Sequence, residues 1–329
     1  SFVEHCNSLN YFPILITLDK ISTQSKNFLY KTYPSKKFKL KSRFFKYIIS
    51  FYYLIKLSLN NNCIIISFQN NIFAVISSII TKSKIIIRLN TSPKKYVKSL
   101  FFKLFFKFFY RYADIILVND IDFQKNIKNF FKLKSYVVHN FVDEKIIKKK
   151  SKEKIKRNFF FKKGYLNIIS VGRLTDQKDH LTILKAIKHS KTKDRIKMII
   201  IGSGYKKKHL INYIKVNSLD KIVELINYKK NPFNYISASD CLILSSKYEG
   251  SPNILLEAAI LKKLIISSNC QTGPRQITSN GKGAYLFEVG NYNKLSNIID
   301  SINLRKKEVK NKIYNSYNLA KKYNKLNQR

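Results

Sequence analysis

The chain has 329 residues, of which 45% are apolar; this excludes a disordered protein and is enough for two domains of ordinary size. Lysine and arginine number 63 against 19 acidic residues, a formal charge of +44. Such a charge has two explanations. It indicates either nucleic acid or an anionic membrane as partner, or only the codon preference of an AT-rich genome. The abundance of Lys, Asn, Ile, Phe and Tyr also indicates an AT-rich genome. Lysine far outnumbers arginine, and this argues against nucleic acid because arginine is the better reader of bases and phosphates.

In the first half, short β-branched runs alternate with longer amphipathic stretches, the pattern of α/β units around parallel sheets. Residues 2–10 are predicted to be the end of a helix and residues 12–19 to contain a strand. The uncharged stretch 57–81 is interrupted by polar residues and predicts strand, loop and helix rather than a membrane span. The predicted strands are 14–18, 64–68, 85–89, 115–118 and 136–139.

Lysine and phenylalanine are concentrated in segments 36–59 and 94–112. Basic residues of the second segment recur at multiples of four, on one helix face, and Phe and Leu fill most of the remainder. Two interpretations stay open: helices packed on a sheet with solvated lysines, or a surface that docks on an anionic leaflet at roughly 1 kcal/mol per basic residue. The basic residues concerned are Lys95, Lys103, Lys107 and Arg111.

The second half follows a lysine-rich run, 144–163, which we interpret as the interdomain connection. Its predicted strands are 168–171, 197–201, 222–225, 241–244, 264–267 and 284–287, and the polar stretch 302–329 is compatible with a helix. We therefore predict two sequential Rossmann-like domains. Their expected limits are 1–145 for the first domain, 146–163 for the linker, 164–300 for the second domain and 301–329 for a helical tail.

The segment 241–258 gives the most direct indication of a ligand-binding site. An apolar run leads into a turn at Gly250, and Pro252 is predicted to be the first residue of a helix because its missing N–H would be unpaired there anyway. Free N–H groups from Gly250 to Asn253, with the positive end of the helix dipole, favour a phosphate. Glu249 and Glu257 are placed to bind sugar hydroxyls on either side, so the segment predicts a nucleotide-sugar site.

These residues also resemble a known family. Glu249 and Glu257, seven residues apart, resemble the E-x7-E motif of retaining glycosyltransferases of family 4, the glycosyl transferases group 1. The resemblance implies a GT-B fold, in which two Rossmann-like domains face a central cleft. The Asn-Pro and Thr-Gly-Pro-Arg variants are similar to bacterial surface-polysaccharide and N-acetylgalactosaminyl transferases. The other similar segments are Val171-Gly172-Arg173-Leu174 with Gln177-Lys178, Ile201-Gly202-Ser203-Gly204, Asn231-Pro232, Ala238-Ser239-Asp240 and Thr272-Gly273-Pro274-Arg275.

The resemblance implies retaining transfer of a hexose or N-acetylhexosamine from a UDP-sugar to a lipid-linked or lipopolysaccharide glycan. Arg173 and Lys178 are expected to stabilise the diphosphate, Glu249 to contact the donor sugar and Glu257 to bind both ribose hydroxyls. No DxD-like pair stands at a strand end, so we expect no metal and no cofactor beyond the donor. The implied donor-binding residues are Gly202, Gly204, Gly250, Ser251, Pro252, Asn253, Ile254 and Glu257.

Simpler alternatives stand beside these roles. Arg173 can pair with Asp176, and both glutamates can be first-turn partners of a helix dipole. One glycine of the pair at 202 and 204 can be purely conformational. The lone histidines and the scattered cysteines, without a CxxC pair, fit structural roles.

The resemblance also implies acceptor-side residues at a strand end of the first domain. These are Arg88, Asn90 and Ser92.

Two departures from the family pattern leave a second function open. Gln276 stands where a glutamate is usual after Gly-Pro-Arg, and Asn227 where a glycine is common. In the family a first strand and a glycine-rich turn precede the helix whose end residues 2–10 resemble and the second strand that residues 12–19 resemble, so the resemblance implies an N-terminal truncation. Together with this truncation, the two departures allow a catalytically incomplete nucleotide-sugar-binding protein. As an enzyme, the chain is expected in the cytoplasm, peripherally associated with the inner face of the plasma membrane. Its expected partners are the donor, the lipid-linked acceptor and an anionic membrane surface, not nucleic acid.

Overall fold

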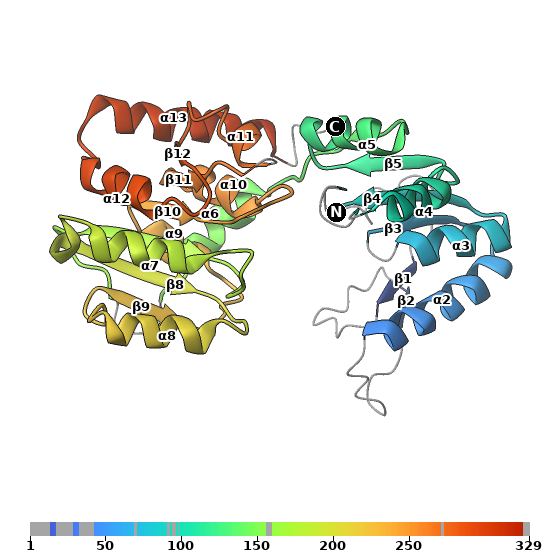
Figure 1. Cartoon of the computed structure of the whole chain (residues 1–329), viewed down its shortest axis with the longest axis horizontal. Coiled ribbons are helices and arrows are strands. Elements are labelled where there is room, and N and C mark those ends of the chain that lie inside the picture. The colour runs from blue at the N-terminus through green and yellow to red at the C-terminus, as the bar shows by residue number, and fades with distance from the viewer. Residues whose placement is uncertain are drawn as a thin grey trace. The chain divides into compact units, whose positions relative to one another are not determined.

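The computed structural model describes residues 14–17, 29–32, 43–68, 71–90, 93, 97, 99–155, 160–270 and 273–324. The chain divides into two compact units: unit 1 is Ser1–Val118 with Gln124–Val137, and unit 2 is Asn119–Phe123 with Val138–Arg329. Each unit contains a parallel sheet with helices (Figure 1). The helix end predicted at 2–10 lies outside the described residues, and the predicted domain limits stay predictions.

Unit 1 contains a four-stranded parallel sheet in the order β3-β4-β5-β6 and a separate parallel pair, β1-β2. All the strands predicted in the first half are confirmed to within two residues, whereas β2 was not predicted. Within the described residues, no helix is long and apolar enough to cross a membrane. The elements are β1 (Ile14–Thr17), β2 (Leu29–Thr32), α2 (Arg43–Leu59), β3 (Ile64–Ser67), α3 (Asn71–Thr81), β4 (Lys84–Leu89), α4 (Leu100–Tyr110), β5 (Ile115–Val118), α5 (Ile121–Phe131) and β6 (Tyr136–Val137).

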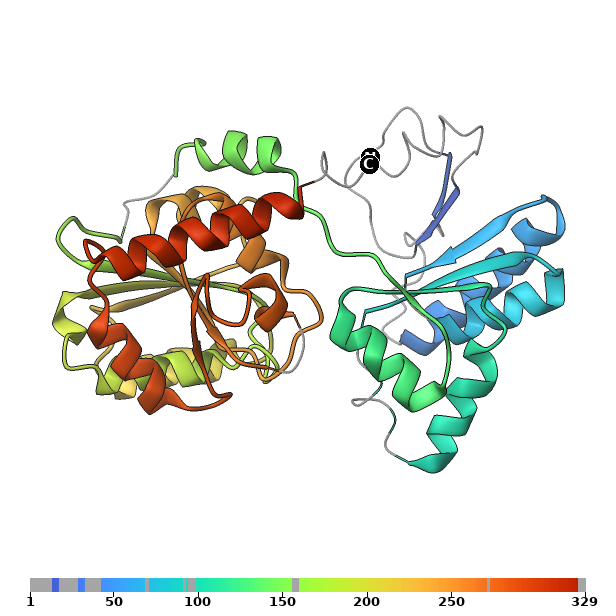
Figure 2. The same cartoon turned by 90° about the horizontal axis from the view of Figure 1, so that it is seen from above.

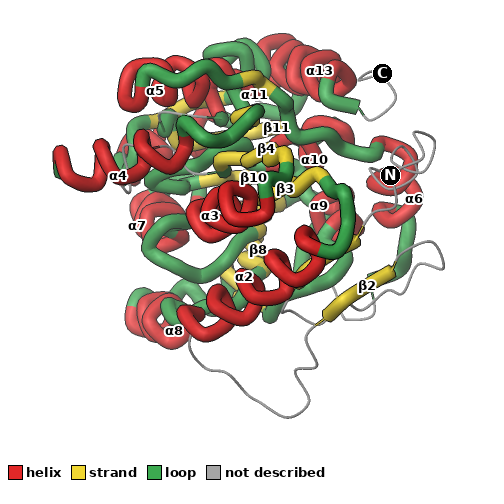
Figure 3. Tube along the Cα trace, turned by 90° about the vertical axis from the view of Figure 1, so that its right-hand side faces the viewer, coloured by secondary structure: helices red, strands yellow, loops and turns green. Residues whose placement is uncertain are grey.

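One face of the unit 1 sheet carries most of its core. In β3, Ile65 and Ser67 are buried while Ile64 and Ile66 are exposed, as expected from the period of two in a strand. The same alternation runs through β4 and β5. Helix α3 packs against β3 and β4, and α2 and α4 lie next to α3 (Figure 3).

Unit 2 contains a six-stranded parallel sheet in the order β12-β11-β10-β7-β8-β9. All the strands predicted in the second half are confirmed to within two residues, and the predicted C-terminal helix is α13. The elements are α6 (Glu144–Ser151), β7 (Leu166–Val171), α7 (His180–His189), η2 (Lys193–Arg195), β8 (Ile196–Ile201), α8 (Lys207–Val216), β9 (Val223–Ile226), α9 (Phe233–Ala238), β10 (Cys241–Leu244), α10 (Asn253–Ile260), β11 (Leu264–Ser268), α11 (Pro274–Ile277), β12 (Tyr285–Phe287), α12 (Tyr292–Ser301) and α13 (Lys307–Lys322).

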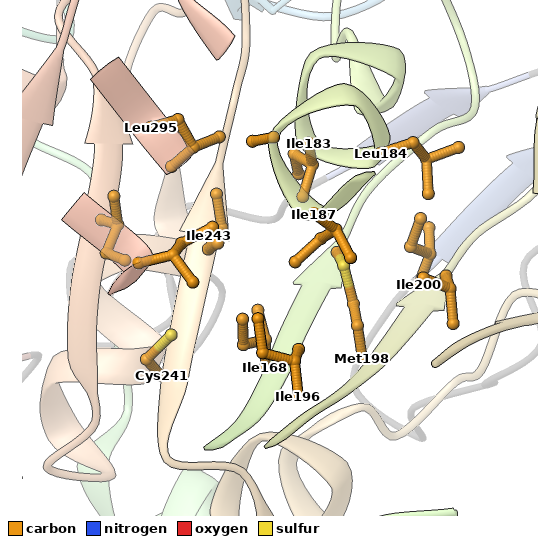
Figure 4. Close-up of a cluster of buried hydrophobic side chains, with 14 of the residues drawn as sticks. Ile168, Ile183, Leu184, Ile187, Ile196, Met198, Ile200, Cys241, Ile243 and Leu295 are labelled. Atoms are coloured by element: carbon orange, nitrogen blue, oxygen red, sulfur yellow. The ribbon is translucent and has the colours of Figure 1, made fainter. Parts of the chain in front are cut away.

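The unit 2 sheet is buried on both faces. Along β8, Met198 and Ile200 belong to one core cluster, while Ile199 and Ile201 belong to the cluster on the opposite face. The first cluster includes side chains of α7, α8 and α12, such as Leu295 (Figure 4). The second includes side chains of α6, α9, α10 and α11, and α13 packs on α10 (Figure 2). Burial on both faces explains why these strands read as continuous apolar runs in the sequence.

Helix α6 lies within the lysine-rich run that we interpreted as the interdomain connection. Asp143 caps the helix, because its Oδ1 accepts a hydrogen bond from the backbone N–H of Ile146 at 3.0 Å. Ile147 is buried, and the helix packs against α9 and α10. A single buried side chain is too little periodicity to predict the helix from sequence.

Candidate functional site

The candidate site lies at the carboxyl ends of three neighbouring strands of unit 2, in the order β10-β7-β8. The loop after β7 carries Arg173 and Lys178, the loop after β8 carries Gly202 and Gly204, and the turn after β10 carries Glu249. Loops that follow adjacent parallel strands lie at the same edge of a sheet, which is where α/β proteins bind their ligands. The fold therefore brings together residues that are far apart in the sequence.

The loops after β7 and β8 pack backbone against backbone. A Cβ atom on Gly202 would lie 2.0 Å from the carbonyl oxygen of Gly172, and one on Gly204 would lie 2.3 Å from that of Leu174. The Leu174 N–H donates to the carbonyl oxygen of Ser203 at 2.8 Å. Both glycines are thus required by the contact between the loops. Their approach to a donor stays a prediction.

Two residues predicted to be catalytic form an ion pair. Lys178 Nζ lies 2.5 Å from Glu249 Oε1, and the Ser246 hydroxyl donates to the same oxygen at 2.5 Å. The side chains of Lys178 and Glu249 are only 15% and 8% exposed. A cation and a carboxylate therefore share one place at the strand ends, largely screened from solvent.

Gln177 connects this pair to Arg173. Its side-chain N–H donates to the backbone oxygen of Tyr248 at 3.1 Å, and its side-chain oxygen accepts from Arg173 Nη2 at 3.0 Å. Its backbone oxygen accepts from Lys247 N at 2.8 Å. Gln177 thus joins the loop after β7 to the turn after β10. The motif Gln177-Lys178 does not indicate this role, because the Tyr248 partner lies 71 residues away in the sequence.

The alternative pairing of Arg173 with Asp176 is wrong. Asp176 instead contacts Lys206 Nζ at 2.8 Å and accepts from the Tyr205 hydroxyl at 2.6 Å. In the part of the chain that the structure describes, no carboxylate pairs with Arg173, whose side chain is exposed. Its guanidinium is therefore available to an anion from outside.

The turn before α10 is held from two sides. Asn140 Nδ2 donates to the Ser251 backbone oxygen at 3.2 Å and to Asn253 Oδ1 at 2.8 Å. On the other side, a Cβ on Gly273 would lie 2.4 Å from the carbonyl oxygen of Gly250. Sequence reasoning missed Asn140, although its place just after a predicted strand was a usable signal.

Helix α10 begins at Asn253, and Pro252 is its N-cap, so the prediction that Pro252 is the first helical residue was wrong by one position. Pro252 is buried, Gly250, Ser251 and Ile254 are partly buried, and Asn253 is exposed. The amino end of the helix therefore remains a candidate anion site in the predicted place.

Glu257 lies on the second turn of α10. Burial raises the pKa of its carboxyl group to about 7. The carboxyl group forms no hydrogen bond or ion pair with other described residues. The first turn of α10 contains no acidic residue, so the alternative that both glutamates are first-turn partners of the dipole is wrong.

The remaining candidates have local partners. His180 is buried and lies 3.2 Å from the Ser170 hydroxyl through Nδ1, and burial lowers its pKa to about 4. In unit 1, Asn90 donates to the Phe68 backbone oxygen at 2.9 Å, and burial lowers the pKa of Arg88. Ser92 lies outside the described residues. The acceptor-side roles stay predictions.

Two α/β units with parallel sheets define a protein of GT-B fold. Residues 151–319 match the model of the family glycosyl transferases group 1, and the chain belongs to this family. HepE of Anabaena, in a crystal structure with UDP and glucose, has a TM-score of 0.72 at 14% identity, over 85% of this chain and 79% of that one.

Two curated relatives extend the comparison. An uncharacterized glycosyltransferase of Methanocaldococcus jannaschii is 31% identical over 63% of this chain and 52% of its own length. The N-acetylgalactosamine-N,N'-diacetylbacillosaminyl-diphospho-undecaprenol 4-alpha-N-acetylgalactosaminyltransferase of Campylobacter jejuni is 26% identical over 65% of this chain and 59% of its own length. The chain thus spans little more than half the length of either relative.

Proposed function

We propose that the chain is a retaining family 4 glycosyltransferase, which moves a hexose or N-acetylhexosamine from a UDP-sugar to a lipid-linked or lipopolysaccharide glycan. The observation that carries the proposal is the meeting of Arg173, the Lys178–Glu249 pair and the amino end of α10 at one edge of the unit 2 sheet. The UDP and glucose bound to HepE support the donor class, and the undecaprenol-linked substrate in the name of the Campylobacter jejuni relative supports the acceptor class.

In the proposed reaction, the bond between the anomeric carbon and the diphosphate oxygen breaks, and the acceptor hydroxyl oxygen attacks from the same face. The hydroxyl proton passes to the departing phosphate oxygen, and UDP leaves. Negative charge grows on the diphosphate during this step, so positive groups that meet it there lower the barrier.

Arg173 and Lys178 supply that positive charge. The guanidinium is suited to contact two phosphate oxygens, while the ammonium is a point charge that leaves Glu249 for the diphosphate. Each charge-assisted contact contributes about 1.5–3 kcal/mol. Together with backbone N–H groups of residues 250–253, they perform the role that a metal ion has in other transferases, so we propose a metal-independent reaction without a further cofactor.

The two glutamates bind the uncharged parts of the donor. Once Lys178 turns to the diphosphate, Glu249 accepts hydrogen bonds from hydroxyls of the transferred sugar. The Glu257 carboxyl group, which has no hydrogen-bond or ion-pair partner among the described residues, accepts from both ribose hydroxyls. A ligand that donates hydrogen bonds to Glu257 compensates the carboxylate for its burial.

The acceptor places the enzyme at a membrane. We propose that it acts in polysaccharide or lipopolysaccharide biosynthesis, in the cytoplasm and peripherally bound to the inner face of the plasma membrane. The formal charge of +44 suits an anionic leaflet.

Thermal stabilisation tests the donor site. UDP and a panel of UDP-sugars are expected to raise the melting temperature of the chain, and Glu257→Ala is expected to abolish this shift. Glu288→Ala, which removes an exposed glutamate of unit 2, is the matched control and is expected to keep the shift. No shift with any nucleotide in the unaltered chain contradicts the proposal.

A second measurement separates the enzyme from its alternative, a nucleotide-sugar-binding protein without turnover. We expect UDP release from the stabilising UDP-sugar when an undecaprenyl-diphosphate-linked glycan is added. Stabilisation by UDP without release, across a panel of such acceptors, supports the incomplete protein instead; Gln276 is the residue to restore to glutamate in that case.

A further inference from the structure

The outer face of α4 is apolar and exposed to solvent. This helix of 11 residues exposes 69% of Leu100 and 70% of Phe101. Among the other described residues, similar values occur for Tyr205, Val216 and Tyr228, each on a different element or loop. Exposed apolar side chains clustered on one element mark an interaction surface, whereas scattered ones do not. The large apolar residues exposed here are Leu100, Phe101, Phe102, Leu104, Phe105, Phe108 and, one residue beyond the C-cap, Tyr112.

Most of these residues form a continuous stripe. Phe101, Leu104, Phe105, Phe108 and Tyr112 follow the spacing i, i+3, i+4, i+7 and i+11, which places them on one side of a helix. Ring centroids lie 6.3 Å apart for Phe101 and Phe105 and 5.5 Å apart for Phe108 and Tyr112. A surface helix normally turns such a stripe to the core, but here it faces outward; we call it the aromatic stripe.

Basic groups border the aromatic stripe, and α4 contains no acidic residue. Lys107 and Arg111 are exposed and one turn apart. The Arg111 guanidinium lies 5.6 Å from the centre of the Phe108 ring and 5.1 Å from that of Tyr112. Cationic groups beside apolar side chains on one short helix are the composition of interfacial helices that lie on anionic lipid.

We propose that the aromatic stripe inserts into the interfacial layer of an anionic bilayer, with Lys107 and Arg111 at the lipid phosphates. The inference rests on the proposed function, because it assigns membrane contact to one helix.

The charge and the length of α4 indicate which partner covers the aromatic stripe. A second copy of the chain would bring like charges together, and 11 residues are about one and a half heptads, too few for a coiled coil. The helix is also roughly 16 Å long, about half of the hydrocarbon thickness, so it lies on the bilayer.

Tryptophan fluorescence tests the insertion directly, because the chain contains no tryptophan. Phe101→Trp places a probe in the aromatic stripe, and Tyr314→Trp places a control probe on α13, at a residue that is 66% exposed. With vesicles of phosphatidylcholine and phosphatidylglycerol, we expect a blue shift and quenching by brominated acyl chains for Phe101→Trp only. Equal responses of both variants, or none from either, overturn the proposal.

Vesicle sedimentation measures what each part of the surface contributes. Phe101→Ala/Phe108→Ala is expected to weaken partitioning by roughly tenfold or more, since large apolar side chains leave the interface. Lys107→Gln/Arg111→Gln is expected to weaken it by roughly tenfold at low salt, and less at high salt. The control Lys294→Gln/Lys310→Gln removes the same charge from exposed residues of unit 2 and is expected to have a smaller effect. If the control weakens binding as strongly, net charge rather than α4 binds the membrane, and the proposal fails.

Two further readouts keep the outcomes apart. A chain that is dimeric in solution and becomes monomeric in Phe101→Ala/Phe108→Ala assigns the stripe to a second copy and overturns the proposal. The far-UV circular dichroism spectrum and the free energy of unfolding in urea are expected to be unchanged in all α4 variants, so a loss of vesicle binding with both retained is a surface effect and not misfolding of unit 1. Conversely, Phe101→Trp insertion without any UDP shift supports the membrane surface while the proposed function fails.

Discussion

The two parallel sheets of this chain use the same residue types in different ways. In unit 2, β8 and β10 are isoleucine-rich and leucine-rich runs buried on both faces. In unit 1, β3 is equally rich in isoleucine, but alternate side chains are exposed, and α4 carries phenylalanines outward. Apolar residues thus form a core on both faces of the sheet that carries the candidate donor site in unit 2, whereas in unit 1 many of the described apolar residues remain at the surface.

Truncation of one isoleucine in each sheet tests this difference most strongly. Ile200, fully buried in β8, is expected to cost about 3–4 kcal/mol of the free energy of unfolding when changed to alanine, because a cavity remains. Ile64, which is 42% exposed in β3, is expected to cost below about 1 kcal/mol for the same change. Urea unfolding of both variants makes the comparison, and equal losses would show that the outer face of β3 is covered in solution.

Glu257 gives a second test of the comparison between the two sheets, because its carboxyl group lies among the buried side chains of unit 2. Its pKa is about 7 in the folded chain against 4.5 as the ordinary value, so the folded state keeps its proton more tightly than the unfolded state. As pH rises from about 4.5 to 7, the unfolded state releases this proton first and stability falls; above pH 7 the loss is complete, at most about 3 kcal/mol.

Glu257→Gln removes this loss. The variant is expected to be more stable than the unaltered chain at pH 8, by at most about 3 kcal/mol, and equally stable near pH 4.5. Urea unfolding at both pH values measures the difference, with Glu288→Gln, an exposed site, as the control. A stability gain that is the same at both pH values would mean that desolvation of the carboxylate is not its cause.

Most of the fold was predictable, for a physical reason that differs between the units. Strands buried on both faces, such as Cys241–Leu244, are continuous apolar runs, and the run itself predicts the strand. β2, with the sequence LYKT, offers no such run and was missed. In α4, periodicity predicted which residues share a face, but it carries no information about what covers that face.

The site was predictable in its parts but not in its contacts. Helix-start chemistry placed the turn before α10 to within one residue. The pairing of Lys178 with Glu249, 71 residues apart, depends on the neighbouring positions of β7 and β10, which no local pattern contains. The same holds for Gln177 and Asn140, whose partners belong to a distant turn.

Removal of Lys178 tests whether the donor site belongs to unit 2 alone. Lys178→Met is expected to weaken UDP binding by roughly 10- to 100-fold, the loss of one charge-assisted contact of about 1.5–3 kcal/mol, measured by titration calorimetry. Arg88→Met, a matched loss of charge in unit 1, is expected to leave UDP affinity unchanged. An equal loss of UDP affinity in Arg88→Met would show that the donor site does not belong to unit 2 alone.

A second variant separates this effect from a loss of stability. Lys178→Met leaves the Glu249 carboxylate, only 8% exposed, without its cationic partner. Removing one member of a buried ion pair destabilises the fold, whereas removing both charges is close to neutral. Lys178→Met/Glu249→Gln is therefore expected to regain stability but not UDP affinity. Recovery of both would place the diphosphate elsewhere.

The smallest expected effect concerns Asn140, which follows β6 of unit 1 closely in sequence but donates its hydrogen bonds within unit 2. Asn140→Ala leaves the Ser251 carbonyl and the Asn253 side chain without these bonds and loosens the turn whose N–H groups are proposed to meet the phosphate. Its expected cost is about 1 kcal/mol, or roughly fivefold in UDP affinity. Asn315→Ala removes a comparable side-chain bond, to the Lys282 carbonyl, and is expected to leave that affinity unchanged. If Asn140→Ala lowers the melting temperature but not UDP affinity, the asparagine only stabilises unit 2. If it lowers affinity at unchanged stability, the turn before α10 must be ordered in advance for the donor to bind.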